Sequence, residues 1–382
     1  MKSRTLFTIT IALACGLLAA GCGHSNSTTE LIPAAVLVNQ NLAESLTIIA
    51  PDQKFIANAK IENPGYMSVG DVVPAGLYSK EKANLPLVYA AYAAGAEVKL
   101  SQNDQIETQR KLDSLSKIAG SNGQQAIAFA DVAYTGSSLK SSLYVANIDN
   151  LALSTPVFQI EDVLQQWALA PLAVEVKDGQ PGGVWYTTTG WGVGGPGLIF
   201  PITQGLNYFD VQAGSNTEYL SRDESLQGLS PDHRLAGSIA SSSSGDHAMT
   251  VTNLETHWTL KFPLRKESDM GSGYAVFPPN GQYAAWLEAG SSPYDPYQYN
   301  YVVRVGNLSE AKVIFEIDAG AAAQTLNTDT VTYLRPVGWL DNNSLLIEAR
   351  GENWQDANVM RLDLGDGKLY QFADGAFVSF LY

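Results

Sequence analysis

A short polar turn recurs six times along the chain, each time between two apolar segments. The turns occupy residues 51–53, 121–123, 177–179, 231–233, 279–281 and 341–343. Asp, Asn and Gly recur in them, and these residues tolerate the positive φ angles of tight hairpins. Counted from the last residue of each turn, the steps are 70, 56, 54, 48 and 62 residues. We therefore expect each turn to join two antiparallel strands of one repeating unit.

A second signal follows the first in most units. An apolar strand runs into a polar turn, and a further short strand comes after it, at 145–149, 208–211, 250–254, 303–308 and 360–364. Four strands in about 55 residues is the layout of a propeller blade. We predict an all-β chain that forms a β-propeller of six four-stranded blades, with seven blades left open. A pair of β-sandwiches is the alternative fold, but it would not explain six comparable units.

Two further segments bear on the number of blades and on ring closure. Within residues 104–118, the apolar residues Ile106, Leu112, Leu115 and Ile118 are spaced by sixes and threes. This spacing predicts a local helix, which would account for the long first step. The apolar segments 32–38 and 376–381 stand outside the repeats. Either of them, we expect, completes the sheet of a terminal blade and closes the ring.

One unit carries a resemblance to a known family. The run Leu-Ser-Pro-Asp-His-Arg-Leu-Ala at 229–236, with Thr-Asn-Leu-Glu-Thr at 252–256, resembles the WD-like repeat of TolB-type β-propellers. In that family a Ser-Pro-Asp-Gly turn precedes an apolar strand, and an Asp-Leu-x-Thr-Gly-type turn closes the third strand. The resemblance covers most of residues 45–373, although no copy has all four residues of the first turn. It implies a propeller fold and a protein partner in the cell envelope.

The first residues read as an export signal. Lys2 and Arg4 precede an uncharged apolar stretch that is too short to span a membrane comfortably. The stretch ends in Leu-Leu-Ala-Ala-Gly before Cys22, and this ending resembles the bacterial lipobox, although Ala19 stands where Leu is more usual. An ordinary signal peptide is the alternative. We expect a lipoprotein signal peptide at 1–21, lipidation of Cys22, a tether and N-terminal strand at 22–44, and the propeller at 45–382.

Charge and cysteine content restrict the location and the partners. The chain has 38 acidic residues against 23 Lys and Arg, a net charge of −15, and no cluster of basic residues. We therefore exclude nucleic acids as partners, and attachment to a membrane would come from the lipid anchor alone. Cys15 lies in the segment to be removed, so the mature chain would have no disulfide. The expected location is the bacterial cell envelope, facing the periplasm or the exterior, as a monomer.

Motifs for catalysis are scarce. The sequence has no Gly-x-Ser-x-Gly elbow, and the mature chain would have no cysteine nucleophile. Three of the four histidines fall within one unit, at spacings that match no compact zinc site, and His233 is expected to be a turn residue. Gly192–Gly197 fits a dinucleotide-binding pattern, but Pro201 prevents the helix that such a site needs. We expect no catalysis, no metal and no cofactor.

The loops that follow the second strand of each unit are long and aromatic. In a propeller these loops gather on one face with the connections between blades. Aromatic side chains in such loops offer rigid contact area for protein or sugar recognition. The candidate binding face consists of Tyr66, Trp167, Trp191, Tyr294, Tyr297, Trp339 and Trp354.

The expected function is a protein-binding or scaffold module, with an envelope protein or a polysaccharide as the partner. The alternative is a carbohydrate-binding protein, or a hydrolase or lyase with a carboxylate site at the mouth of the central channel. A purely structural envelope protein is the third hypothesis.

Overall fold

The computed structural model describes most of the residues between positions 32 and 382. The described residues are 32–40, 43–62, 72–74, 78, 86–91, 96–103, 105–123, 125–190, 199–241, 246–291, 299–353 and 355–382.

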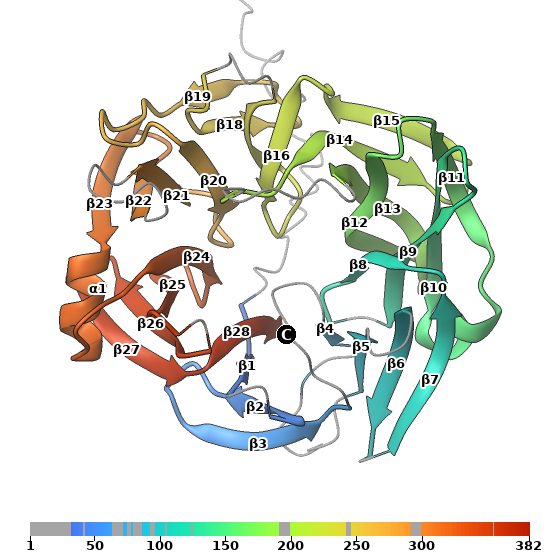
Figure 1. Cartoon of the computed structure of the whole chain (residues 1–382), viewed down its shortest axis with the longest axis horizontal. Helices are drawn as coiled ribbons and strands as arrows, with labels where there is room; N and C mark the ends of the chain where they lie inside the picture. The colour runs from blue at the N-terminus through green and yellow to red at the C-terminus, as the bar shows by residue number, and fades with distance from the viewer. Residues whose placement is uncertain are drawn as a thin grey trace, which may run out of the picture. The chain divides into compact units, whose positions relative to one another are not determined.

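Seven four-stranded antiparallel sheets follow one another round a ring, so the predicted β-propeller is confirmed (Figure 1). The seven sheets are the blades of the propeller. In the order from the innermost strand to the outermost, blade 1 consists of β28 (Ala376–Leu381), β1 (Ala35–Asn39), β2 (Ser45–Ile49) and β3 (Phe55–Lys60). Blade 2 consists of β4 (Val72–Pro74), β5 (Leu87–Ala91), β6 (Ala96–Gln102) and β7 (Gln105–Leu112). Blade 3 consists of β8 (Leu115–Gly120), β9 (Ala126–Tyr134), β10 (Leu139–Asn147) and β11 (Pro156–Asp162), with a short 3-10 helix, η1 (Ile148–Leu153), before β11.

The other four blades use consecutive strands in the same way. Blade 4 consists of β12 (Trp167–Lys177), β13 (Gln180–Gly190), β14 (Thr203–Asp210) and β15 (Ser215–Leu220). Blade 5 consists of β16 (Glu224–Leu229), β17 (Leu235–Ala240), β18 (Thr250–Asn253) and β19 (Thr259–Lys261). Blade 6 consists of β20 (Gly271–Val276), β21 (Tyr283–Ser291), β22 (Tyr299–Asn307) and β23 (Lys312–Asp318). Blade 7 consists of β24 (Tyr333–Trp339), β25 (Ser344–Arg350), β26 (Ala357–Asp363) and β27 (Lys368–Asp374), and the helix α1 (Ala319–Leu326) precedes it.

The ring has seven blades, the count that the sequence left open beside the expected six. Five of the six turn signals join the first and second strands of a blade, but the turn at 51–53 joins the third and fourth strands of blade 1. In blade 2, the first and second strands are joined by residues 75–86, which contain no comparable turn signal. The long step of 70 residues therefore contains an additional blade.

The predicted helix within residues 104–118 is wrong. Within this range, residues 105–112 form β7, which pairs with β6, and residues 115–118 belong to β8, which pairs with β9. Leu115 and Ile118 of β8 are buried against neighbouring strands. Strand β7 is an outer strand, and its residues are exposed or half-buried. Strand pairing and burial between blades outweigh the local spacing of the apolar residues.

The ring is closed by pairing the two ends of the described chain. Strand β28 pairs with β1 in antiparallel register, with Ala35 opposite Leu381 and Asn39 opposite Ala376. The expectation that segments 32–38 and 376–381 complete a terminal blade is thus confirmed. Strand β1 is fully buried, and so are Phe377, Val378 and Leu381 of β28, so closure also completes a hydrophobic core.

The alternating strand direction defines two faces of the ring. We use "upper face" for the one with the connections between blades and the loops from second to third strands. The "lower face" has the turns from first to second and from third to fourth strands. Among the residues that the structure describes, no helix is long and apolar enough to cross a membrane.

Candidate functional site

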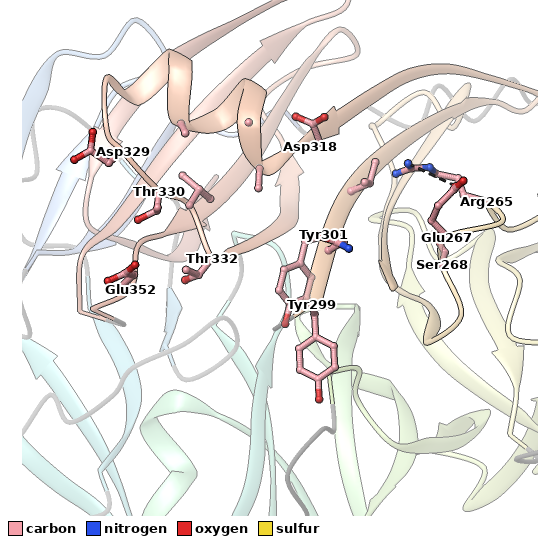
Figure 2. Close-up of a pocket in the computed structure, with 16 residues that line it drawn as sticks. Arg265, Glu267, Ser268, Tyr299, Tyr301, Asp318, Asp329, Thr330, Thr332 and Glu352 are labelled. Carbon is pink, nitrogen blue, oxygen red and sulfur yellow. Dashed lines mark ion pairs between the residues drawn. The ribbon is translucent and has the colours of Figure 1, made fainter. Parts of the chain in front are cut away.

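A cleft of about 780 Å³ opens on the upper face between blades 6 and 7. Figure 2 shows Arg265, Glu267 and Ser268 on one side and Asp329, Thr330, Thr332 and Glu352 on the other, with Tyr299 and Tyr301 between them. The volume lies within the range of pockets that bind small ligands. We refer to it as the blade 6–7 cleft.

One wall of the cleft is held by a buried carboxylate, Glu288 on β21. Its Oε2 accepts hydrogen bonds from the backbone N–H of Arg265 at 3.1 Å and from the Ser268 hydroxyl at 2.8 Å. Its Oε1 accepts from the Arg304 guanidinium at 2.5 Å and from the Trp286 indole N–H at 3.2 Å. Because Glu288 is completely buried, these bonds form out of water and fix the segment that precedes β20.

The opposite wall depends on the helix α1. Asp318 ends β23 and accepts a hydrogen bond from the backbone N–H of Ala321 at 2.8 Å, which caps the N-terminus of the helix. Asn327 ends the helix in the left-handed region, with φ of 52°. The chain then turns back along the cleft, where the Thr332 hydroxyl donates to the carbonyl of Gly351 at 2.7 Å.

Two tyrosines of β22 lie between the walls. The ring centroids of Tyr299 and Tyr301 are 6.1 Å apart, and Tyr301 makes an edge contact with Tyr333 at 5.1 Å. Burial raises the pKa of Tyr301 to about 12, so its hydroxyl stays protonated at neutral pH. Both rings are half-buried, and they provide aromatic surface beside polar groups.

The charge in the cleft is negative. Its described lining contains four carboxylates, those of Glu267, Asp318, Asp329 and Glu352, and one guanidinium, that of Arg265. Arg265 lies 3.9 Å from Glu267, a separation that leaves the pair weak and exposed to solvent screening. The cleft therefore favours a ligand that carries positive charge and hydrogen-bond donors.

A neighbouring pocket of about 440 Å³ continues the acidic surface over blade 7. It shares Asp329, Thr330, Val331 and Glu352 with the cleft and adds Asp356. A ligand longer than one side chain could therefore extend from the cleft into this pocket.

The predicted lipidation site and the predicted binding-face residues fall into three groups. Cys22, Tyr66, Trp191, Tyr294, Tyr297 and Trp354 lie outside the described residues, as does the glycine-rich segment at 192–197. Trp167 lies at the upper end of β12 and lines a separate pocket of about 340 Å³. Trp339 lies at the lower end of β24, is 3% exposed, and stacks on Tyr283 at 6.2 Å, so it packs in the core and is not part of an exposed face.

The residues that build the cleft are not among the site residues predicted from the sequence. Tyr299 and Tyr301 continue the aromatic run that begins at Tyr294, and that run was the available signal. Asp318 directly before an alanine-rich segment is a pattern typical of a helix N-terminus. Glu288 could have been noticed as a charge inside an otherwise apolar strand.

His233 occupies a tight turn with φ of 59°, as the sequence predicts, and it also joins a cluster on the lower face. Glu175 on β12 accepts hydrogen bonds from the Trp185 indole at 2.7 Å and from the Tyr208 hydroxyl at 3.0 Å, and lies 3.2 Å from Nδ1 of His233. The hydrogen bond with His233 lowers the pKa of Glu175 to about 2, against the opposing effect of burial and with help from Trp185 and Tyr208. The cluster joins blade 4 to blade 5. Among the described residues, no group of His, Cys, Asp and Glu is arranged to hold a metal ion.

No protein-family model matches the sequence, and no characterised protein matches it by sequence. Solved structures of similar fold include TolB from Acinetobacter baumannii, with 12% identity and a TM-score of 0.43, over 75% of this chain and 63% of TolB. Oligogalacturonate lyase in complex with manganese is 12% identical, with a TM-score of 0.50 over 90% of this chain and 85% of the lyase. A puromycin-hydrolyzing peptidase of Mycobacterium tuberculosis is 10% identical, with a TM-score of 0.52 over 90% of this chain and 51% of the peptidase. At these identities the likeness shows the fold alone, and the chain spans less than two thirds of TolB and about half of the peptidase.

The expectation that the chain has no catalysis of its own needs correction. The solved structures that share its fold include a lyase and a peptidase. The expectation came from the absence of linear nucleophile and metal motifs. A site assembled from side chains of several blades leaves no such motif in the sequence, so the missing motifs do not exclude catalysis.

Proposed function

We propose that this chain is a binding module of the bacterial cell envelope that holds a basic segment of a partner protein in the blade 6–7 cleft. The observation that carries the proposal is the cleft itself, with its four carboxylates and two tyrosines on the upper face. A Lys or Arg side chain would lie against the rings of Tyr299 and Tyr301, where cation–π attraction adds to charge-assisted hydrogen bonds.

The location is part of the same proposal. The lipobox-like ending before Cys22 supports anchoring by lipid, because several acyl chains hold a protein stably at a membrane. The overall charge of −15 favours approach of a basic partner and disfavours anionic ones. The upper face would be the surface offered to the partner.

The test is site-specific photocrosslinking in intact cells. A photoreactive amino acid replaces Tyr299 in the cleft, and the control position is Leu153, which is 84% exposed on the lower face. We expect one envelope protein to be captured from position 299 and not from 153. Capture should fall at least tenfold when Asp329→Asn and Glu352→Gln are combined. Both side chains are exposed, so the two substitutions should not affect folding.

Purified partner and protein then distinguish charge recognition from other contacts. Affinity should fall with added salt for the native protein and depend less on salt for the double variant. Equal capture from both positions, or capture that the double variant leaves unchanged, would contradict the proposal.

A second candidate function is cleavage of an envelope polysaccharide in the same cleft, either by hydrolysis or by a lyase reaction. The observation that favours it is the set of carboxylates beside two tyrosine hydroxyls, which are groups that can exchange protons with a sugar substrate. Release of oligosaccharides from envelope polysaccharide by the native protein, and not by the Asp329→Asn, Glu352→Gln variant, would support this function.

A further inference from the structure

A second pocket on the upper face differs from the blade 6–7 cleft in its chemistry. It has a volume of about 340 Å³ and lies where blades 4, 5 and 6 meet. Trp167 is the first residue of β12, and residues 199–204 lead into β14 and form its first two positions. Ile239 lies near the end of β17, and Met270 directly precedes β20. We refer to it as the Trp167 pocket.

The described lining of this pocket is mainly apolar, and its one ionisable side chain is the imidazole of His247. Trp167, Phe200, Ile239 and Met270 supply most of the surface, and no Asp, Glu, Lys or Arg is among the described lining residues. In a chain of net charge −15, such a neutral surface is selective against ions.

Internal hydrogen bonds of the walls hold the pocket in shape. The Thr203 hydroxyl donates to the carbonyl of Leu226 at 2.7 Å, and the Gln227 amide donates to the carbonyl of Pro201 at 3.1 Å. The Ser272 hydroxyl donates to the carbonyl of His247 at 2.7 Å. Because these polar groups are already paired, the surface that remains open to a ligand is mainly hydrocarbon and ring.

The inner strand of blade 6 makes room for one wall. A Cβ atom at Gly273 would lie 2.4 Å from the ring of Phe200, so only glycine lets this ring pack on β20. Tyr274 follows with φ of 53°, a left-handed conformation that is uncommon for an aromatic residue, at a register shift in the pairing of β20 with β21. Its ring contacts that of Phe200 at 6.2 Å. Strained backbone of this kind is retained where the surroundings specify it strongly.

Two polar side chains of the pocket remain available to a ligand. Gln204 and His247 line it, and their side chains make no hydrogen bond to any other residue among those the structure describes. An amide and an imidazole can each donate to a carbonyl or accept from a hydroxyl.

We propose that the Trp167 pocket binds a small, neutral, mainly apolar molecule that carries one carbonyl or hydroxyl group. Its body lies against Trp167, Phe200 and Met270, and its polar group meets Gln204 or His247. This site is separate from the acidic cleft and does not depend on the function proposed for that cleft.

Benzophenone is a suitable probe, since it is a neutral aromatic ketone. On illumination its carbonyl oxygen abstracts a hydrogen atom from a nearby C–H group, and the two carbon radicals then join in a new C–C bond. Methionine is a favoured acceptor, and Met270 is 36% exposed at the pocket. We expect labelling of the full chain to saturate with probe concentration and to map to Met270 and its neighbours in the pocket.

Matched variants decide between specific and nonspecific labelling. Trp167→Ala should raise the half-saturating concentration at least tenfold, whereas Trp258→Ala, at an exposed tryptophan of the lower face, should leave it unchanged. Met270→Glu should raise it similarly, and Leu153→Glu, at an exposed position of the lower face, should leave it unchanged. Met270 is partly exposed, so this second pair keeps the test valid if Trp167→Ala fails to fold. Labelling that rises without saturation and spreads over exposed residues such as Leu153 and Leu164 would overturn the proposal, as would saturation that Trp167→Ala or Met270→Glu leaves unchanged.

Discussion

Blades 6 and 7 each contain one fully buried glutamate at the equivalent position of the second strand. Glu288 lies in the sequence Leu-Glu-Ala of β21, and Glu348 lies in Ile-Glu-Ala of β25. Glu288 accepts hydrogen bonds from Arg265 and Ser268, which precede the inner strand of its own blade. Glu348 instead accepts from the backbone N–H of Phe377 at 2.9 Å, in the inner strand of blade 1. A buried carboxylate thus supports one wall of the blade 6–7 cleft in blade 6 and ring closure in blade 7.

The arginines around the two carboxylates also differ. Glu348 is shared by Arg335 at 3.3 Å and Arg350 at 2.8 Å. Arg304, beside Glu288, also pairs with Glu316 at 3.1 Å, a residue that is half-exposed. Loss of Glu348 therefore leaves more uncompensated positive charge in the interior than loss of Glu288 does. The comparison teaches that equal burial does not mean equal importance for stability.

The largest effect is expected for Glu348→Gln. Removing the charge leaves two arginines facing a neutral amide and weakens the contact with β28, so the free energy of unfolding should fall by about 3–5 kcal/mol. Urea unfolding followed by fluorescence measures the change. A loss no greater than that of Glu288→Gln would show that the two glutamates are equivalent in stability after all.

Glu288→Gln should have a smaller effect on stability and a larger effect on binding. We expect a loss of about 2–3 kcal/mol, because Glu316 still compensates Arg304 while the hydrogen bonds of a buried group weaken. The wall of the cleft that contains Arg265 should loosen, so photocrosslinking from position 299 should fall. Glu348→Gln, measured where it is still folded, is the matched control and should retain capture.

Glu175 extends the comparison to a paired carboxylate that is partly exposed, and so shows how exposure reduces the contribution of such a group to stability. Its pKa is held at about 2 in the folded protein, below the ordinary value of 4.5, so it stabilises the fold above pH 4.5. That contribution is lost as the pH falls from about 4.5 through 2. Since the side chain is 41% exposed, Glu175→Gln should cost only about 1 kcal/mol at pH 6. The difference in melting temperature from the native protein should shrink toward pH 2, and a difference that is constant with pH would contradict this assignment.

Asp329→Asn should have the smallest effect on stability. The side chain is exposed in the cleft, and such substitutions usually change the free energy of unfolding by less than about 0.5 kcal/mol. Binding of a basic peptide should nevertheless weaken severalfold. A stability loss comparable to that of Glu288→Gln would place Asp329 among the structural carboxylates.

Turn chemistry made most of the propeller predictable. Asn122, Asp178, Asn280 and Asn342 stand in hairpins between first and second strands, where their backbone preferences act locally. Blade 2 was missed because its corresponding connection, 75–86, has no compact polar turn, and because β7 shows an apolar spacing compatible with a helix. Local sequence patterns predict the positions of turns well, but they predict poorly which strands pair with each other.

The cleft was much less predictable. Glu267, Tyr301, Asp329 and Glu352 come from four separate segments, and only the ring brings them together. The sequence predicts Trp339 on the binding face, because the repeat alone does not show which end of the strand this residue occupies. The structure locates it at the opposite, buried end of β24. A single sequence provides the residue types of a site of this kind, but not their shared location.

The pairing of β28 with β1 also determines when blade 1 can be completed as the chain is made and folds. Leu37 meets Ser379, a partner 342 residues later in the chain, so the contact that completes blade 1 spans nearly the whole propeller. Such a contact is entropically slow to form, and it becomes available only after every other blade has been synthesised. Until then, blade 1 presents an unpaired edge that can bind other strands. In a chain of this topology, the edge of the first strand therefore stays open to other strands until the last strand has been made.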